Sequence, residues 1–247
     1  MNPSLFNTLY ISRQDMLNQL VELDVVSNNL ANANTTGYKR TRTNFQELLS
    51  DQMIEGGLPV ATQTMIQQGG LHVSENMLDW AIQGEGYFPM RLPDGQIGYS
   101  RDGNFTRDSS GQLVNTSGYP LDWQGVIPDD AVDISVLDGG QVQVVRGNGQ
   151  VVMAGTIQLA RFANPTGLLN GGNNVWLATQ ASGAAQLGQP GTGLYGQVRT
   201  HQVESSNTDM SQEMTSMVTL QRAFQMSVRA MQQTDNMISQ AIHMRKA

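Results

Sequence analysis

Both ends of the chain carry apolar residues at alternating intervals of three and four, the heptad pattern of a helix that packs along a narrow seam. The polar residues Arg13, Ser27, Gln221 and Asp235 fall in register with the two seams. The apolar seam residues are Phe6, Leu9, Met16, Leu20, Leu23 and Leu30 near the N-terminus, and Met210, Met214, Met217, Phe224, Val228, Met231, Ile238 and Ile242 near the C-terminus. The pattern predicts a long, coiled-coil-like helix at each end.

Local signals mark the limits of both predicted helices. Asn2 is a plausible N-cap and is followed by Pro3, which suits the first helical position because its missing N–H is not needed there. The apolar pattern stops at residues 34–37, a run rich in Asn and Thr that ends in glycine. Asp209 followed three residues later by Gln212 resembles a capping box. We therefore expect helices up to about residue 34 and from about residue 210.

Between the ends, short alternating runs are separated by turn residues, which is typical of β-hairpins. Residues 141–145 and 150–153 flank the clearest of these turns. The predicted turns are Pro93-Asp94-Gly95, Asp102-Gly103-Asn104, Ser109-Ser110-Gly111 and Gly147-Asn148-Gly149. All but one of the 26 glycines lie in residues 51–204. The middle of the chain is therefore expected to be β-rich.

These patterns predict an α+β fold with four segments. Residues 1–36 would form the N-terminal helix of an axial domain, and residues 205–247 would form its C-terminal helix. Residues 37–74 have neither period clearly and are expected to form an extended connector. Residues 75–204 would form the β-rich central domain.

The two narrow seams must be buried against something, and the sequence leaves two possibilities. The helices could pair with each other as an intramolecular antiparallel pair. Alternatively, the seams could pack mainly between molecules, as the helical layers of a tube. Half of the 14 methionines lie in the last 43 residues, and methionine adapts to slightly unequal contacts of the kind found in a polymer.

Composition excludes several classes of protein. A formal net charge of −7 argues against a protein that tracks nucleic acid, which needs a concentrated basic surface. The absence of cysteine excludes disulfides, thiolate catalysis and Cys-ligated zinc. No apolar run reaches the length that spans a bilayer, and residues 1–20 lack the pattern of a cleaved signal peptide. We expect either a cytosolic protein or one exported without a cleaved leader.

The chain offers little sign of metal or cofactor chemistry. His72, His201 and His243 lack zinc-ligand spacing, and we interpret them as surface or packing residues. Residues 102–108 alternate like the start of a calcium loop, but Arg107 stands where an EF-hand needs glycine, so we interpret them as a hairpin. Two Gly-x-Gly pairs lack the strand-then-helix context of a nucleotide loop. We expect no cofactor and no metal.

Two rival functions remain open on the residues alone. Asp129, Asp130 and Asp133 could supply a carboxylate pair for a peptidoglycan hydrolase, because only their separation in space matters. A secreted adhesin or effector is the other rival. An enzyme would need a pocket with perturbed carboxylates, whereas an adhesin would keep its function without the terminal segments.

Several motifs resemble those of the flagellar axial proteins of the rod and hook. The N-terminal signature of that family is similar to the run SNNLANANTTGYKR at residues 27–40, which includes Asn28, Asn29, Leu30, Ala31, Asn32, Gly37 and Tyr38. Further elements are similar at GEGYF (84–88), YSRDGNF (99–105), SNTD (206–209), EM (213–214) and QRAF (221–224). The resemblance covers nearly the whole chain.

The resemblance implies a structural rod subunit and not an enzyme. Such a subunit would be exported by the flagellar type III apparatus, would self-associate through its terminal helices into a tube that transmits torque, and would contact neighbouring rod and hook proteins. Its place would be the basal body, outside the cytoplasm. A hook-type protein is the alternative, but 247 residues leave no room for the further outer domain that hook proteins carry. The stretch between Phe45 and Gly84 is shorter than in the distal rod protein, so both proximal and distal positions stay open.

Overall fold

The computed structural model describes residues 3–44 and 61–246, with the side chains of residues 13–44 and 62–240. The chain divides into two compact units. The first, called here the helical unit, comprises the described residues up to 32, from 41 to 65 and from 208 onward. The second, the β body, comprises residues 33–40 and 66–207.

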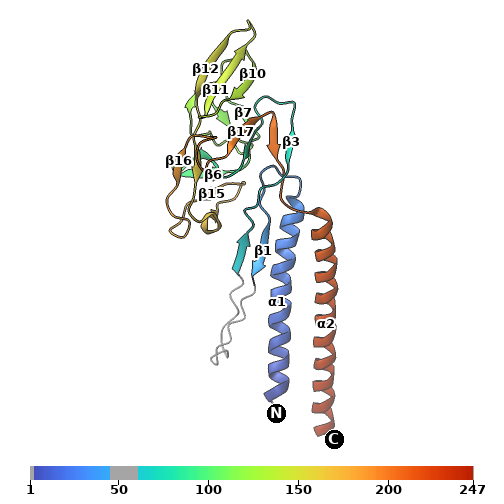
Figure 1. Cartoon of the computed structure of the whole chain (residues 1–247). Helices are drawn as coiled ribbons and strands as arrows, with labels where there is room; N and C mark the ends of the chain where they lie inside the picture. Colours follow the sequence, from blue (N-terminus) through green and yellow to red (C-terminus); the bar gives the residue numbers. More distant parts are fainter. Residues whose placement is uncertain (1–2, 45–60, 247) are drawn as a thin grey trace. The chain divides into compact units, whose positions relative to one another are not determined.

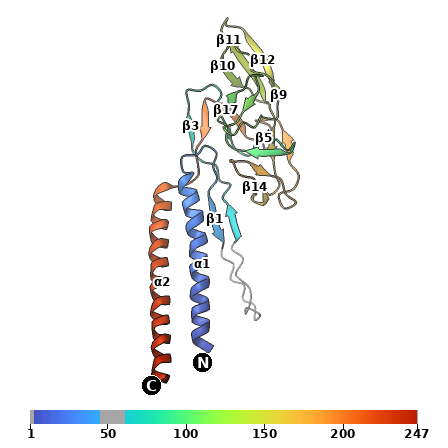
Figure 2. The ribbon, with the colours of Figure 1, turned by 180° about the vertical axis from the view of Figure 1, so that it is seen from behind.

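The helical unit contains two α-helices and a two-stranded sheet. Helix α1 spans Pro3–Ala31 and helix α2 spans Met210–Lys246. The helices lie side by side and run antiparallel, so that the two ends of the chain lie at the same end of the pair (Figures 1 and 2). Strands β1 (Thr41–Asn44) and β2 (Ala61–Thr64) pair antiparallel within residues assigned by the sequence to a connector.

The predicted cap of the C-terminal helix is confirmed. Asp209 Oδ1 accepts hydrogen bonds from the backbone N–H groups of Ser211 at 2.9 Å and Gln212 at 3.2 Å. These are donors that the first turn of a helix cannot satisfy internally. Helix α1 ends at Ala31, just before the Asn/Thr-rich run at which the apolar pattern stops.

The β body is built from short strands and one turn of 3₁₀-helix. The 3₁₀-helix η1 spans Pro165–Gly167. The strands are β3 (Leu71–Val73), β4 (Trp80–Gln83), β5 (Phe88–Arg91), β6 (Ile97–Ser100), β7 (Thr106–Arg107), β8 (Leu113–Val114), β9 (Gln124–Gly125), β10 (Ala131–Val136), β11 (Gln141–Arg146), β12 (Val151–Thr156), β13 (Leu159–Arg161), β14 (Leu169–Asn170), β15 (Trp176–Leu177), β16 (Gln186–Gly188), β17 (Gln197–Thr200) and β18 (Gln202–Glu204).

The sheets of the body combine local hairpins with long-range pairs. One four-stranded sheet has the order β10-β11-β12-β9, and another has the order β14-β15-β6-β5. Strands β17 and β18, near the end of the body, pair antiparallel with β4 and β3, near its start. These long-range pairs bring the first and last segments of the body together.

Three of the four predicted turns are confirmed. They join β5 to β6, β7 to β8, and β11 to β12, each pair being antiparallel. The hairpin predicted at Asp102-Gly103-Asn104 is wrong, because β6 and β7 on either side of it do not pair with each other. Gly103 instead packs against Trp80: the Trp80 N–H donates to the Gly103 carbonyl at 2.8 Å, and a Cβ on Gly103 would lie 1.5 Å from the Trp80 carbonyl oxygen.

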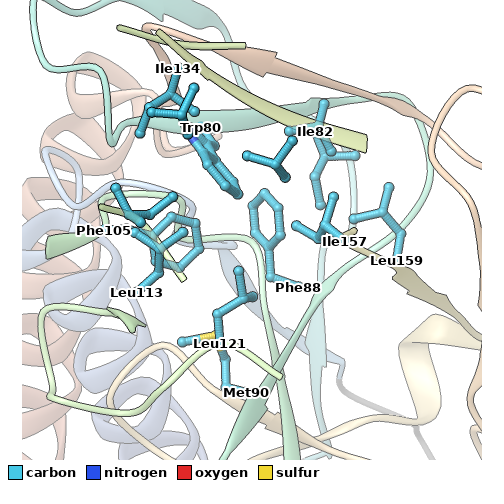
Figure 3. Packing of buried hydrophobic residues seen from close by; sticks show 14 residues of the cluster. Trp80, Ile82, Phe88, Met90, Phe105, Leu113, Leu121, Ile134, Ile157 and Leu159 are labelled. Carbon is cyan, nitrogen blue, oxygen red and sulfur yellow. The ribbon is translucent and has the colours of Figure 1, made fainter. Parts of the chain in front are cut away.

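The main core of the body is aromatic and fully enclosed. Trp80, Phe88 and Phe105 have no exposed surface and meet edge to face, with the Phe88 and Phe105 centroids 5.3 Å apart at 81° (Figure 3). Such contacts add to the stabilisation from burial itself. A second cluster forms around Phe162, whose ring lies 4.8 Å from that of Tyr99.

The predicted fold class is wrong. The described residues hold only two α-helices, one toward each end of the chain, around a large β-rich body. The expected coiled-coil-like domain would bury both heptad seams, but Leu20 is 46% exposed and Met214 is 54% exposed. The heptad pattern describes a stripe of apolar residues in the sequence, but a stripe alone does not supply the knobs-into-holes packing that defines a coiled coil.

Candidate assembly surface

The predicted seam residues are incompletely covered. Leu20, Met210, Met214 and Met231 are exposed, and none of the seam side chains that the structure describes is fully buried. The half-buried members are Met16, Leu23, Leu30, Met217, Phe224, Val228 and Ile238. The side chains of Phe6, Leu9 and Ile242 lie outside the described residues. An apolar stripe that keeps this much exposure is a candidate surface for contact with another molecule.

The most deeply buried side chains of the two helices are mostly polar. Asn29 and Glu213 are each 1% exposed, and among the α1 side chains that the structure describes, from residue 13 onward, Val26 is the apolar one that is buried. Asn29 Nδ2 donates to Glu213 Oε2 at 3.5 Å, so the two helices meet through these groups. Helix packing in the helical unit therefore depends on a buried polar contact at one end.

Asn29 also joins α1 to the strand that follows it. Its amide exchanges two hydrogen bonds with the backbone of Thr41, Nδ2 donating to the carbonyl at 2.7 Å and Oδ1 accepting from the N–H at 2.9 Å. An asparagine side chain can imitate a backbone amide in this way and thus extend the pairing at the start of β1. Asn29 was expected as a motif residue, and the structure gives it this bridging position.

The remaining N-terminal motif residues contribute less to the packing. Asn28 and Ala31 are exposed, and Leu30 and Asn32 are half-buried. Asn32 Nδ2 donates to the Asn28 carbonyl at 2.9 Å, which satisfies an acceptor in the last turn of α1. These residues end the helix.

Gly37 makes a close backbone contact within the β body. Its φ is +66°, and a Cβ there would lie 2.5 Å from the Asp102 backbone nitrogen. Its N–H donates to the Glu204 carbonyl at 2.7 Å. Glycine is required here both by the left-handed conformation and by the close approach. The next residue, Tyr38, is half-buried, and its carbonyl accepts a long hydrogen bond of 3.4 Å from the Asn207 N–H.

A buried ion cluster lies beside Gly37. The Glu204 carboxylate has no exposed surface; it forms an ion pair with Lys39 Nζ and lies 3.3 Å from Arg101 Nη1. Lys39 Nζ also donates to the Gln67 carbonyl at 2.9 Å. Arg101 Nη2 donates to the Gly84 carbonyl at 2.7 Å, and the guanidinium lies 5.2 Å from the centre of the Tyr87 ring.

Burial and the neighbouring charge act in opposite directions on the protonation of Lys39. Burial lowers the pKa of the Lys39 ammonium, and the adjacent Glu204 carboxylate opposes that shift. With two cations and one anion, the cluster depends on Glu204, because removing it would leave two buried positive charges side by side. The carbonyl groups of Gln67, Ile82 and Gly84 accept further hydrogen bonds from the two cations.

Asp102 is a second buried carboxylate next to this cluster. Its Oδ1 accepts from Thr36 Oγ1 at 2.6 Å and from the Asn104 N–H at 3.2 Å. Burial raises the pKa of the Asp102 carboxyl, and these hydrogen bonds partly counter the rise. Asp102 therefore ties the segment around Thr36 to the turn that carries Gly103.

One face of the sheet β10-β11-β12-β9 exposes a second set of apolar side chains. Val132 is 64% exposed, at the irregularity in β10, and Val151 and Met153 on β12 are also exposed. Residues two apart on a strand point to the same face, so Val151 and Met153 share one side of the sheet. The opposite side holds the buried Val144 and Ile134.

The carboxylates that might have served a hydrolase are engaged on the surface. Asp129 forms an ion pair with Arg107, Asp130 lies 3.6 Å from Arg146, and Asp133 lies 3.4 Å from His201. Every one of the three carboxylates is more than half exposed. A glycoside hydrolase uses two carboxyl groups that flank the scissile bond, whereas each of these three carboxylates is paired with a different basic side chain on the surface.

Within the described residues, no three His, Asp or Glu side chains gather as a metal site. His72 is exposed on β3, and His201 adopts a φ of +57° between β17 and β18. The side chain of His243 lies outside the described residues. Neither helix in the described part of the chain is apolar enough over its length to cross a membrane.

Sequence reasoning missed the members of the buried cluster. Lys39 and Arg101 lie inside the quoted motifs, at GYKR and YSRDGNF. The half-buried Asn207, whose side chain shares the Gln67 carbonyl with Lys39, lies in SNTD, and Glu204 lies two residues before that motif. Charged residues are normally solvated, so composition gave no reason to place them in an interior. One signal in the sequence could have indicated the cluster. Three separate motifs each contain a charged or amide residue for which the local pattern of turns and apolar positions gives no role.

Three family models match the chain. The model of the flagellar basal-body rod protein matches residues 9–39, the flagellar hook protein FlgE/F/G D1 domain matches residues 81–144, and the C-terminal model of the flagellar basal-body rod FlgEFG protein matches residues 200–244. The N-terminal and C-terminal matches include most of α1 and α2, and the middle match lies in the β body.

Curated relatives agree with these matches, and two of those named here do so over more than nine-tenths of the chain. The flagellar basal-body rod protein FlgG of Caulobacter vibrioides is 37% identical, over 93% of this chain and 96% of its own. The protein of the same name from Bacillus subtilis is 33% identical, over 98% and 100%. The flagellar hook protein FlgE of Escherichia coli is 38% identical, but over only 49% of this chain and 30% of its own. The resemblance drawn from the motifs is thus confirmed, and the chain belongs to the FlgEFG family of flagellar rod and hook proteins.

Proposed function

We propose that the protein is a structural subunit of the bacterial flagellar basal-body rod, which self-associates into a tubular shaft that transmits torque. The observation that carries this proposal is the similarity to rod proteins across almost the full length of both chains. The hook protein matches less than a third of its own length, which favours the rod over the hook. The role is structural and not enzymatic.

The exposed apolar residues of the helices support assembly through the helical unit. A large side chain such as Met214 or Leu20 that stays half exposed loses favourable burial in the single chain and regains it against a neighbour. We propose the seam residues of α1 and α2 as the interface with adjacent subunits. We also propose that the four segments expected from the sequence, divided at residues 36, 74 and 204, have separate roles in the polymer.

The exposed face of the β10-β11-β12-β9 sheet suits a second contact with another copy of this chain. Subunits of a helical polymer make heterologous contacts, in which two different surfaces of the same protein meet. Val132, Val151 and Met153 would give such a contact an apolar centre. Two separate contacts per subunit would resist bending and twisting better than one.

The proposal extends to partners and location. Neighbouring rod and hook proteins would contact the first and last copies in the polymer, which is supported by the shared FlgEFG family models. Export by the flagellar type III apparatus and a place in the basal body outside the cytoplasm complete the proposal. No nucleic acid and no membrane insertion are part of it.

The direct test is incorporation into basal bodies. Phe224→Asp places a charge on the proposed interface of α2, and Gln225→Asp places the same charge on the next residue, which is exposed. Both variants are produced in a flagellated host that lacks the wild-type chain, and basal bodies are purified and probed for the protein. We expect the first variant to be absent from basal bodies and the second to be present at the wild-type level.

A folding control separates loss of assembly from loss of structure. The β body reports its own fold through Trp80, Trp123 and Trp176, which all lie outside the helical unit. The tryptophan fluorescence of purified Phe224→Asp should match that of the wild type. Incorporation of Phe224→Asp at the wild-type level would refute the assignment of the interface to this face of α2.

A further inference from the structure

All four places where the chain crosses between the helical unit and the β body lie close in sequence to members of the buried ion cluster. The chain passes from one unit to the other after residues 32, 40, 65 and 207. Within the body, the segments next to these crossings are residues 33–40, 66–70 and 204–207. Each of these three segments contributes a group to the cluster: Lys39, the Gln67 carbonyl and Glu204.

Direct bonds connect the first of these segments to the last. The Gly37 N–H donates to the Glu204 carbonyl at 2.7 Å, and the Arg40 N–H donates to Asn207 Oδ1 at 2.7 Å. The Lys39 ammonium pairs with the Glu204 carboxylate between these two hydrogen bonds. The segment that follows α1 and the segment that precedes α2 are thus joined at three successive points.

The middle segment is joined to the same groups. Asn207 Nδ2 and Lys39 Nζ both donate to the Gln67 carbonyl, each at 2.9 Å. The Gly69 N–H donates to Glu204 Oε1 at 3.0 Å. Arg101, on the other side of Glu204, anchors the carboxylate to the body through the Gly84 carbonyl.

We propose that this cluster, Lys39, Arg101, Glu204 and Asn207, is a mechanical clamp that holds the terminal segments together where they enter the β body. Force applied to the two ends of the chain enters the β body at the clamp, because residues 33–40 and 204–207 are the first parts of the body along either path. The bonds between those two segments are then stretched together. Bonds that are loaded in parallel share the force, which makes the clamp stronger than any one of its contacts.

The clamp rests on the proposed rod function for its purpose, since a shaft must carry force between its helices and its outer domain. Its existence rests on the contacts alone. The experiment therefore uses single molecules of the full chain and needs no assembly, so that a failed rod assignment and a failed clamp give different results.

The test is single-molecule pulling of the full chain in two directions. The sequence has no cysteine, so attachment points can be introduced without interference. One set of molecules is pulled from its two ends, across the clamp. The other is pulled through Gln96→Cys and Gln150→Cys, which lie in exposed turns of the body away from the clamp. Glu204→Gln is compared with the wild type in both directions.

We expect Glu204→Gln to lower the force at which the β body first opens when the chain is pulled from its ends, after the helix pair has separated, and to leave that force unchanged when the chain is pulled through residues 96 and 150. Arg161→Gln, which removes the solvent-accessible ion pair with Glu85, is the matched control and should change neither force. An equal fall in both directions would show a general loss of stability and overturn the clamp. No fall in either direction would overturn it as well.

Hydrogen exchange gives a second readout that also serves if Glu204→Gln does not fold. Asn207→Ala removes two hydrogen bonds of the clamp without leaving a buried charge. Its amides at Gly37, Arg40 and Gly69 should exchange about tenfold faster than in the wild type, whereas those of β11 and β12 should not change. Unchanged exchange at Gly37 and Gly69 would show that the segments are held by other contacts and would overturn the proposal.

Discussion

The β body and the helical unit bury different kinds of side chain. The centre of the body holds large aromatic groups such as Phe88 and Phe105, which have no exposed surface. In the described part of the helices the buried groups are Val26, Asn29 and Glu213, while many leucines and methionines remain exposed. The body completes its core within one chain, whereas the helices leave apolar surface uncovered, which is the arrangement expected of a subunit that assembles through its helices.

The largest expected effect is on the core of the body. Phe88→Ala should lower the free energy of unfolding by about 3–5 kcal/mol, because it leaves a cavity among fully buried rings. Leu20→Ala, on the half-exposed surface of α1, should lower it by well under about 1 kcal/mol. Denaturant titration monitored by tryptophan fluorescence measures the first change, and circular dichroism at 222 nm measures the second. Equal losses in the two variants would contradict the comparison.

A smaller effect is expected where the chain enters the body. Gly37→Ala should lower the free energy of unfolding of the body by about 3 kcal/mol, since a Cβ there combines an unfavourable positive φ with a clash against backbone atoms. Gly95 also has a positive φ, +81°, but has nothing within 4 Å of a Cβ. Gly95→Ala should therefore cost only the conformational strain, about 1 kcal/mol.

Thermal or denaturant unfolding of both glycine variants measures the difference. A Gly37→Ala protein no less stable than Gly95→Ala would show that residues 33–40 can move away from Asp102 and Arg101 at little cost. The close packing around Gly37 would then contribute little to the body.

In the helical unit the expected effect of a polar deletion is smaller still. Asn29→Ala removes the paired hydrogen bonds to Thr41 and the contact with Glu213, and should cost about 1–2 kcal/mol. Asn28→Ala, one residue earlier and exposed, should cost a few tenths of a kcal/mol. The rate of hydrogen exchange at the Thr41 amide measures the effect of each of the two substitutions. Similar exchange rates in the two variants would show that the buried amide does not hold β1 to α1.

The smallest effect concerns pH. Because burial raises the pKa of Asp102 in the folded state, the folded protein binds a proton more tightly than the unfolded chain. The contribution of Asp102 to stability therefore falls as the pH rises from the unfolded pKa of about 3.9 through the raised folded pKa. Asp102→Asn keeps an acceptor for Thr36 and removes the charge, so it should be at least as stable as the wild type at neutral pH.

The direction of this pH dependence is tested by measuring the free energy of unfolding of Asp102→Asn and of the wild type between pH 4 and pH 8. The wild type should lose stability relative to the variant as the pH rises. A variant that becomes relatively less stable toward neutral pH would mean that the ionised carboxylate is favoured in its hydrogen-bonded site.

Local patterns predicted local features well. Asp209 was recognised as a helix cap and caps α2, and three of four turns join the strands that they were expected to join. Hydrogen bonds between near neighbours in sequence determine such features, so a short stretch of residues contains all the information they need. The hairpin predicted at residues 102–104 is wrong because the position of Gly103 is set by its contact with Trp80, which lies more than 20 residues away along the chain.

The sequence by itself determined the family, through motifs at both ends and in the middle, and it determined where helices cap and most hairpins turn. Only the tertiary structure decided how much of the heptad seams is covered, and it replaced the expected α+β class with a large β-rich body and two helices, one toward each end of the chain. It also revealed that Lys39, Arg101 and Glu204 form one buried cluster. The physical reason is that burial and ion pairing depend on which distant segments meet, and the long-range strand pairs β3–β18 and β4–β17 that bring these segments together leave no periodic signal in any one of them.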